Sequence, residues 1–176
     1  MNQTKITVIN TGGTFNKVYD AVKGTLDVVK ENVFIEEIIR HFYGNIDFEL
    51  LSIINKDSLQ FTDEDRELLA VTVANAANDN VLIVHGTDTM QESAKYLHDK
   101  TGATLDKKVI FVGSMFPYAI QKDEAIANFS LAVGFLNAPV PNDIYIAMHG
   151  LVDCFETIQK NRELGKFVRI PPFVSA

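Results

Sequence analysis

Short apolar runs alternate with longer amphipathic stretches along almost the whole chain. The apolar runs have the length of strands and lie at residues 5–10, 48–54, 80–86, 107–113 and 143–148. The amphipathic stretches between them have the length of helices and lie near residues 32–43, 62–78, 89–100 and 122–137. Strands that alternate with helices form βα units around a parallel sheet. The pattern predicts an α/β fold with an open, mostly parallel sheet flanked by helices, flavodoxin-like or Rossmann-like, in a single domain over residues 1–176.

Local signals mark the ends of some of these elements. Thr62, followed three residues later by Asp65, predicts the capped start of the second helix. The segment after Gly150 is less regular, and we expect two short strands around a turn there. The paired prolines of the final "PPFVSA" should end any regular element, because proline lacks the backbone N–H that such elements use.

The net charge and the cysteine content limit which partners the protein can bind and in which cell compartment we expect it. The net charge of -7 argues against binding to nucleic acid, which normally requires a basic face. Cys154 is the single cysteine, so neither an intrachain disulfide nor a cysteine-rich metal site can form, and we expect this thiol in the core. The first ten residues do not have the pattern of a signal peptide, and no run reaches the roughly 18 apolar residues of a membrane span. We therefore expect a cytoplasmic protein without membrane contact.

Polar residues and glycines gather where the expected strands end. They lie at residues 11–14, 57–58, 85–89 and 113–115, each directly after an apolar run. In an open parallel sheet, ligands bind outside the carboxyl ends of the strands, so these four loops should converge on one crevice. Any one of the loops is most simply a turn or a helix cap. Their convergence favours a ligand site.

The chemistry available in such a crevice starts from a threonine hydroxyl. This group is a weak nucleophile and needs a base or a relay that takes its proton, a role that a lysine can fill. Lys160, taken alone, is most simply a surface lysine, and His85 and His149 are most simply the polar ends of strands. The chain lacks the "GxSxG" motif of serine hydrolases, the Walker and dinucleotide glycine patterns, and a metal quartet at ligand spacing. We expect neither a cofactor nor a metal.

The motifs "TGGTF", "HGTDTM" and "GSM" occur in this order, each after an expected strand. With them the chain resembles the bacterial-type L-asparaginases, and most of all their short, single-domain form. The resemblance covers essentially the whole chain but only the N-terminal domain of the usual family member, whose C-terminal domain is absent here. It implies hydrolysis of L-asparagine to L-aspartate and ammonia through a threonine acyl-enzyme, without a metal.

The resemblance also implies roles for individual residues. It places the nucleophile at Thr14 and the tyrosine of a mobile lid at Tyr19. It places the second catalytic threonine at Thr87, the amine-binding aspartate at Asp88 and the family lysine at Lys160. A relay through the second threonine and the lysine would take the proton of the nucleophile.

The remaining expected site residues hold the substrate. By resemblance, Ser58 holds the α-carboxylate. The expected substrate-binding residues are Gly13, Asp57, Ser58, Gly86, Ser114 and Met115. Leu59 and Gln159 stand where many relatives have glutamine and threonine, which leaves the preference between asparagine and glutamine open.

The partners implied are the small-molecule substrate and further copies of the chain. In two-domain relatives an acidic residue from the neighbouring subunit's C-terminal domain helps to bind the α-ammonium, so we expect a homodimer or homotetramer that completes the site in another way. Three other functions stay open. They are a glutaminase or amidotransferase domain, a non-catalytic amino-acid-binding module, and a nucleoside-processing enzyme with Asp57 as its carboxylate nucleophile.

Overall fold

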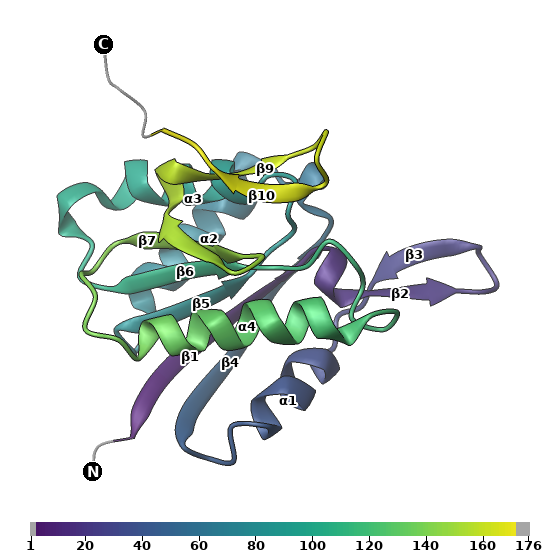
Figure 1. Cartoon of the computed structure of the whole chain (residues 1–176), viewed down its shortest axis with the longest axis horizontal. Coiled ribbons are helices and arrows are strands. Elements are labelled where there is room, and N and C mark those ends of the chain that lie inside the picture. Colours follow the sequence, from purple (N-terminus) through teal and green to yellow (C-terminus); the bar gives the residue numbers. More distant parts are fainter. Residues whose placement is uncertain (1–2, 172–176) are drawn as a thin grey trace.

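A sheet of six strands forms the centre of the molecule (Figure 1). The computed structural model describes residues 3–171. The strand order is β4-β1-β5-β6-β7-β8, and every neighbouring pair is parallel except β7 with β8. The strands are β1 (Thr4–Gly12), β4 (Ile46–Lys56), β5 (Asn80–Val84), β6 (Lys108–Val112), β7 (Ile144–Met148) and β8 (Leu151–Cys154). The predicted α/β fold is therefore confirmed.

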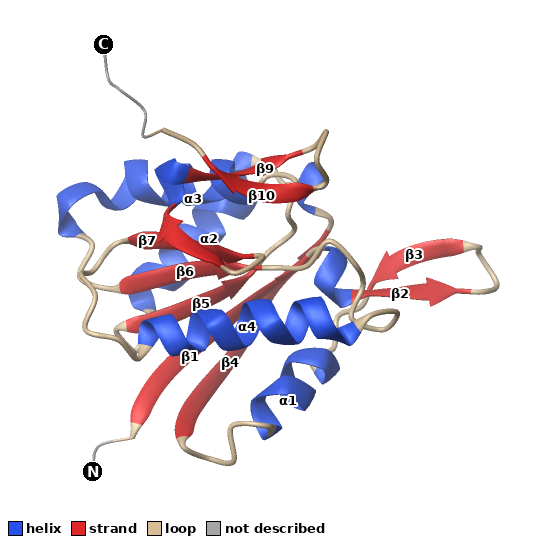
Figure 2. Cartoon of the chain, viewed as in Figure 1, coloured by secondary structure: helices blue, strands red, loops and turns tan. Residues whose placement is uncertain are grey.

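Four helices cover the two faces of this sheet (Figure 2). They are α1 (Val33–Arg40), α2 (Asp63–Asn75), α3 (Met90–Thr101) and α4 (Lys122–Leu136). Ile38 of α1 and Phe129 of α4 belong to the same buried cluster as Val8 of β1. The next residue of that strand, Ile9, points to the opposite face and joins Leu69 of α2. Both faces are thus buried, which explains why the strands read as continuous apolar runs rather than as alternating ones.

The ends of the helices follow local chemistry. The predicted capping box of α2 is confirmed, since the Asp65 N–H donates to Thr62 Oγ1 (3.3 Å) and the Thr62 N–H donates to Asp65 Oδ2 (2.9 Å). This helix ends at Asn75, three residues before the predicted end, because the next residue is extended. Helix α1 ends at Arg40 rather than at residue 43, and Tyr43 has a positive φ of 49° that no helix accommodates.

Two hairpins stand outside the central sheet. The first consists of β2 (Lys17–Asp20) and β3 (Thr25–Val28), where the sequence predicted only a loop, and it projects away from the body (Figure 1). The second consists of β9 (Ile158–Asn161) and β10 (Lys166–Arg169).

Between Gly150 and residue 171, the last that the structure describes, the chain forms three strands, β8, β9 and β10, and not the two that were predicted. His149 and Gly150 both have positive φ values, 54° and 79°, and this tight turn brings β8 back antiparallel to β7. The second hairpin follows. The prediction about the closing prolines falls mainly on residues 172–176, which lie outside the described residues.

Cys154 is only partly buried, in contrast to the expected core position. It is the last residue of β8, which lies at the edge of the sheet, so a single neighbouring strand covers it. The side chain still packs against the core, and burial raises the pKa of the thiol.

Within residues 3–171, no helix combines the length and apolar character needed to cross a bilayer.

Candidate active site

The four loops that carry the expected site residues follow four neighbouring strands. Strands β4, β1, β5 and β6 lie side by side and run parallel, so their carboxyl ends open at the same edge of the sheet (Figure 1). This arrangement confirms the predicted convergence. We call this edge the site edge.

Backbone of three of these loops meets at the site edge. A Cβ atom added to Gly13 would lie 2.5 Å from Gly86 Cα, and one added to Gly86 would lie 2.5 Å from Ser58 Oγ. Gly13 also has a φ of 75° and donates its N–H to the Lys56 carbonyl (2.9 Å). Glycine is required at both positions because no side chain fits between the loops. The two glycines therefore join the ends of β1, β4 and β5.

Thr14 begins a short 3-10 turn, Thr14–Asn16, directly after Gly13. Phe15 is fully buried, and Asn16 Nδ2 donates to Asn10 Oδ1 and to the Gly12 carbonyl, each at 2.9 Å. These contacts anchor the turn from its inner side. The Thr14 side chain stays partly exposed at the site edge, where a nucleophile could meet a substrate.

Lys160 reaches Thr87 and Asp88 from the second hairpin. Its Nζ lies 2.9 Å from Thr87 Oγ1 and 3.0 Å from Asp88 Oδ1. The Lys160 side chain is 15% exposed, so the interpretation of an ordinary surface lysine is wrong. Arg162 follows on the same hairpin, and its Nη1 lies 2.6 Å from Asp88 Oδ1. Sequence reasoning missed this arginine, because the motif that marks Lys160 says nothing about its neighbours.

Ser58 offers a buried hydroxyl without a partner. The residue is 1% exposed, and its Oγ has no hydrogen-bond partner among the described residues. The Ser58 carbonyl accepts a hydrogen bond from Thr89 Oγ1 (2.9 Å), which ties the end of β4 to the loop after β5. Buried polar atoms are nearly always paired in native structures, so a free hydroxyl at a site edge is suited to a ligand oxygen.

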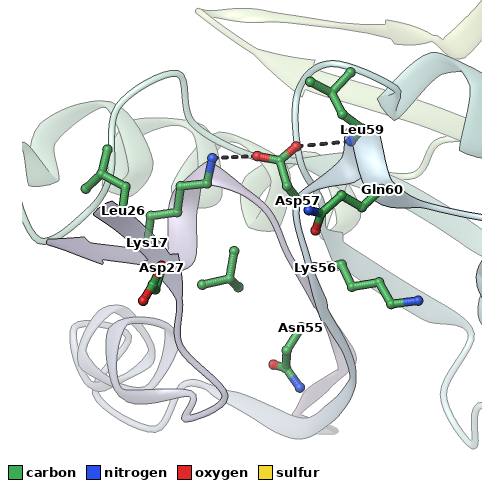
Figure 3. Close-up of a pocket in the computed structure, with 9 residues that line it drawn as sticks. Lys17, Leu26, Asp27, Asn55, Lys56, Asp57, Leu59 and Gln60 are labelled. Atoms are coloured by element: carbon green, nitrogen blue, oxygen red, sulfur yellow. Dashed lines mark hydrogen bonds and ion pairs between the residues drawn. The ribbon is translucent and has the colours of Figure 1, made fainter. Parts of the chain in front are cut away.

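Asp57 pairs with Lys17 rather than with the residues around Thr87 (Figure 3). The Lys17 Nζ lies 2.5 Å from Asp57 Oδ2, and Asp57 Oδ1 accepts the Leu59 N–H (3.0 Å). Burial raises the pKa of this carboxyl, but the Lys17 ammonium and the Leu59 N–H together outweigh burial and lower it. Asp57 lines a hollow of about 390 Å³ between the first hairpin and the end of β4, to which Leu26 also contributes.

Tyr19 lies on β2 of the first hairpin, opposite Leu26 of β3. Its side chain is 63% exposed to solvent. The structure thus brings Thr87, Asp88 and Lys160 together and places Tyr19 on a projecting element.

Ser114 and Met115 lie in the loop after β6, and their polar groups are already engaged. Ser114 Oγ donates to the Phe116 carbonyl (2.6 Å). The N–H groups of Met115 and Phe116 donate to the two carboxylate oxygens of Glu124, at 2.8 and 3.1 Å. These two residues therefore shape the wall of the site edge.

His149 links Glu124 to the second hairpin. Its Nδ1 accepts the Phe167 N–H (3.2 Å), so its Nε2 carries the proton and donates to Glu124 Oε1 (2.8 Å). His149 does follow β7, as expected, but sequence reasoning missed this bridge and Glu124 altogether. No spacing signal could have shown it, because the two residues meet only after the chain reverses at Gly150.

His85 is fully buried between the rings of Phe61 and Phe111. Burial lowers its pKa to about 4, so the imidazole is neutral near pH 7 and its Nδ1 donates to the Gly86 carbonyl (2.8 Å). His85 thus supports the loop that carries Thr87 from below. Across residues 3–171, no group of three or more histidine, cysteine or acidic side chains is arranged to hold a metal ion.

Comparison with known proteins identifies relatives of this chain. The family model for the N-terminal region of asparaginase matches residues 5–165. The chain is 29% identical over 153 residues to a glutamyl-tRNA(Gln) amidotransferase subunit of Aeropyrum pernix, a match that covers 84% of this chain and 35% of that protein. It is 27% identical over 176 residues to a glutaminase-asparaginase of Pseudomonas fluorescens, with 94% of this chain and 46% of that protein covered. The chain thus spans less than half the length of these curated relatives.

Solved structures show the same fold. The thermostable L-asparaginase from Thermococcus kodakarensis superposes with a TM-score of 0.80 at 24% identity, covering 95% of this chain and 51% of that one. L-asparaginase I from Vibrio cholerae gives 0.82 at 24% identity, with 97% and 53% covered. A probable cytoplasmic L-asparaginase from Campylobacter jejuni gives 0.75 at 26% identity, with 98% and 60% covered.

Proposed function

Since this chain belongs to the asparaginase family, whose N-terminal model covers residues 5–165, we propose that it hydrolyses the side-chain amide of L-asparagine to L-aspartate and ammonia. The observation that carries the proposal is the contact of Lys160 Nζ with Thr87 Oγ1 (2.9 Å) at the site edge where Thr14 begins its turn. A lysine held against a threonine hydroxyl provides a path for a proton, which threonine chemistry requires.

The proposed reaction proceeds through an acyl-enzyme. Thr14 Oγ1 attacks the side-chain amide carbon and forms an ester, while its proton passes through Thr87 and Lys160 to the departing nitrogen, which leaves as ammonia. Water then attacks the ester carbon, its proton returns to Thr14 Oγ1, and L-aspartate leaves. The backbone N–H of Thr87 is suited to stabilise the oxyanion of each tetrahedral intermediate.

The other predicted residues are assigned to substrate binding. The Asp88 carboxylate would bind the α-ammonium, and the unpaired hydroxyl of Ser58 would donate to the α-carboxylate. Gly13 and Gly86 contribute by letting the loops that carry Thr14, Ser58 and Thr87 pack against one another. Asp57, Ser114 and Met115 shape the site through contacts that they already make.

The proposal includes the first hairpin and a partner subunit. Tyr19, exposed on β2, would close over the substrate as part of a lid. We further propose that residues 1–176 act as one N-terminal-type domain in a cytoplasmic homodimer or homotetramer, whose partner surface completes the ammonium site. The Campylobacter jejuni relative, described as a probable cytoplasmic L-asparaginase, supports this location.

A second candidate function is glutaminase activity at the same residues. It is supported by the 27% identity to a glutaminase-asparaginase. An extra methylene in a substrate changes binding only modestly, so one site can accept both amides.

Ammonia release from L-asparagine and L-glutamine tests the proposal. We expect Thr14→Ala to reduce release to background, since it removes the nucleophile. Lys160→Met should lower kcat/KM by about 10²- to 10⁴-fold, since it removes part of the proton path. The matched control is Lys166→Met on the same hairpin, an exposed lysine that should leave kcat/KM unchanged. The ratio of kcat/KM for L-asparagine to that for L-glutamine decides between the two candidate functions. No release from either amide by the folded wild type would overturn both.

A further inference from the structure

One carboxylate at the site edge faces two cations. Asp88 Oδ1 lies 3.0 Å from Lys160 Nζ and 2.6 Å from Arg162 Nη1. Glu92 also lines the small cavity next to them, but its carboxylate lies 3.4 Å from Arg66 and is already paired. In direct contact, therefore, two cations share the single carboxylate of Asp88.

The two cations differ in how firmly they are held. Lys160 is part of β9 and its side chain is 15% exposed, whereas the side chain of Arg162 is 63% exposed. Arg162 is the first residue of the turn that follows β9, and from there its side chain reaches the same Asp88 oxygen as Lys160. Within residues 3–171, Asp88 is the only carboxylate that pairs with Arg162. The exposed guanidinium can therefore turn into solvent, but no other carboxylate among the described residues pairs with it.

An ammonium group that approached Asp88 would be the third cation at a single carboxylate. Both cations contact Oδ1, and Oδ2 has no partner among the described residues, so an ammonium that bound at Oδ2 would lie next to the guanidinium and share the carboxylate with it. A ligand without an ammonium group would not meet this repulsion. Like charges close together disfavour each other, and the guanidinium additionally attracts anions.

We infer that Arg162 competes with the α-ammonium of the substrate for Asp88 and thereby sets substrate preference. The site then accepts ω-amides of dicarboxylic acids that lack the α-amino group, such as succinamate, better than it would without this arginine. This inference rests on the proposed function, because it assigns the α-ammonium to Asp88.

The size of the effect follows from the exposure of Arg162. Ion pairs that solvent reaches are worth about 0.2 to 1 kcal/mol, which corresponds to at most about a fivefold change in an equilibrium constant. We therefore expect removal of the guanidinium to shift the preference about 1.4- to fivefold toward L-asparagine. Salt should reduce this shift, because it screens exposed charges.

The test compares Arg162→Gln with wild type on L-asparagine and succinamate. We expect the ratio of kcat/KM for asparagine to that for succinamate to rise about 1.4- to fivefold, mainly through KM for asparagine, and the rise to shrink at about 1 M salt. Arg169→Gln is the matched control, since Arg169 is an exposed arginine of the same hairpin that pairs with Asp153 (3.3 Å). It should leave the ratio unchanged. An unchanged ratio in Arg162→Gln would overturn the inference while leaving the hydrolase intact.

Calorimetry with the products separates failure of the inference from failure of the proposed function. L-aspartate and succinate differ only in the α-ammonium, and their binding requires no turnover. If neither amide is hydrolysed, the proposed function fails, and the ratio of the two dissociation constants in wild type and Arg162→Gln still measures the competition. Equal ratios, or no binding of either product to either protein, would overturn the inference.

Discussion

Two hairpins of the same construction lie outside the central sheet, and they are anchored in opposite ways. The β9–β10 hairpin inserts Ile158 and Phe167 into the core, where they are 0% and 3% exposed. The β2–β3 hairpin contains no fully buried residue and projects from the body, attached through contacts such as the Lys17–Asp57 ion pair (Figures 1 and 3). The firmly anchored hairpin carries Lys160, whereas the loosely anchored one carries Tyr19. Buried apolar contacts thus hold the hairpin that places Lys160 at a fixed distance from Thr87. The hairpin that carries Tyr19, which is proposed to cover the substrate, has no such contacts.

Truncation of one side chain in each hairpin is the strongest test of this contrast. We expect Phe167→Ala to lower the free energy of unfolding by about 3 to 5 kcal/mol, because it leaves a cavity under the hairpin. Leu26→Ala, in the other hairpin, removes a side chain that is 44% exposed and should cost below about 1 kcal/mol. Urea denaturation measures both values. Equal losses would mean that the two hairpins are anchored alike.

The bridge from Glu124 through His149 to Phe167 is a second anchor of the β9–β10 hairpin. Glu124→Gln keeps one acceptor oxygen but turns an NH₂ group toward a backbone N–H, so one donor of the loop after β6 loses its partner. We expect a loss of about 1 to 3 kcal/mol in the free energy of unfolding.

The same variant should also raise KM, since the loop after β6 forms a wall of the site. Glu37→Gln is the control for Glu124→Gln. The exposed Glu37 of α1 pairs with Lys122 (2.7 Å), which lies with Glu124 in the first turn of α4. Thermal denaturation and steady-state kinetics provide the two readouts. A Glu124→Gln protein as stable as Glu37→Gln would show that the carboxylate of Glu124 does not stabilise the loop after β6.

The smallest expected effect concerns the ion pair that attaches the β2–β3 hairpin. Lys17→Met should lower the free energy of unfolding by about 0.5 kcal/mol at pH 7, because Lys17 stabilises the ionised form of a partly exposed carboxyl. The pKa of Asp57 is lowered in the folded state, so this contribution is present above its unfolded pKa of about 4 and is lost as the pH falls through the folded value.

The difference between wild type and Lys17→Met should therefore disappear at low pH. Unfolding curves between about pH 7 and pH 3 measure it. Lys23→Met controls for loss of charge, since Lys23 pairs only with Asp20 and Asp27 inside the same hairpin, among the residues that the structure describes. A difference that grows on acidification would contradict the assignment of the ion pair.

The same contrast explains what could be predicted from the sequence. The strands at the site edge are buried on both faces, so Val8, Ile9 and their neighbours form uninterrupted apolar runs that mark the sheet directly. The β2–β3 hairpin buries almost nothing, and its sequence "KVYDAVKGTLDV" therefore carries no such signal.

The site residues likewise fall into those that the sequence could predict and those that it could not. The proximity of Lys160 to Thr87 was implied by family motifs, and the structure brings the two together. The contacts of Arg162 with Asp88, and of His149 with Glu124, depend on the reversal of the chain after β7. Arg162 and His149 belong to no recognised motif, and their partners are distant in sequence, so no pattern could have shown these contacts.

The order of the site residues along the chain has a consequence for synthesis in the cell. A ribosome releases the N-terminal part first, and β1, β4, β5 and β6 can pair while the rest is still being made. The lysine then has to join a threonine 73 residues earlier, and this becomes possible only when the hairpin that follows β8 has emerged and docked. A nascent chain can therefore have its parallel strands paired while the contact between Lys160 and Thr87 is still missing, and the docking of the β9–β10 hairpin makes that contact.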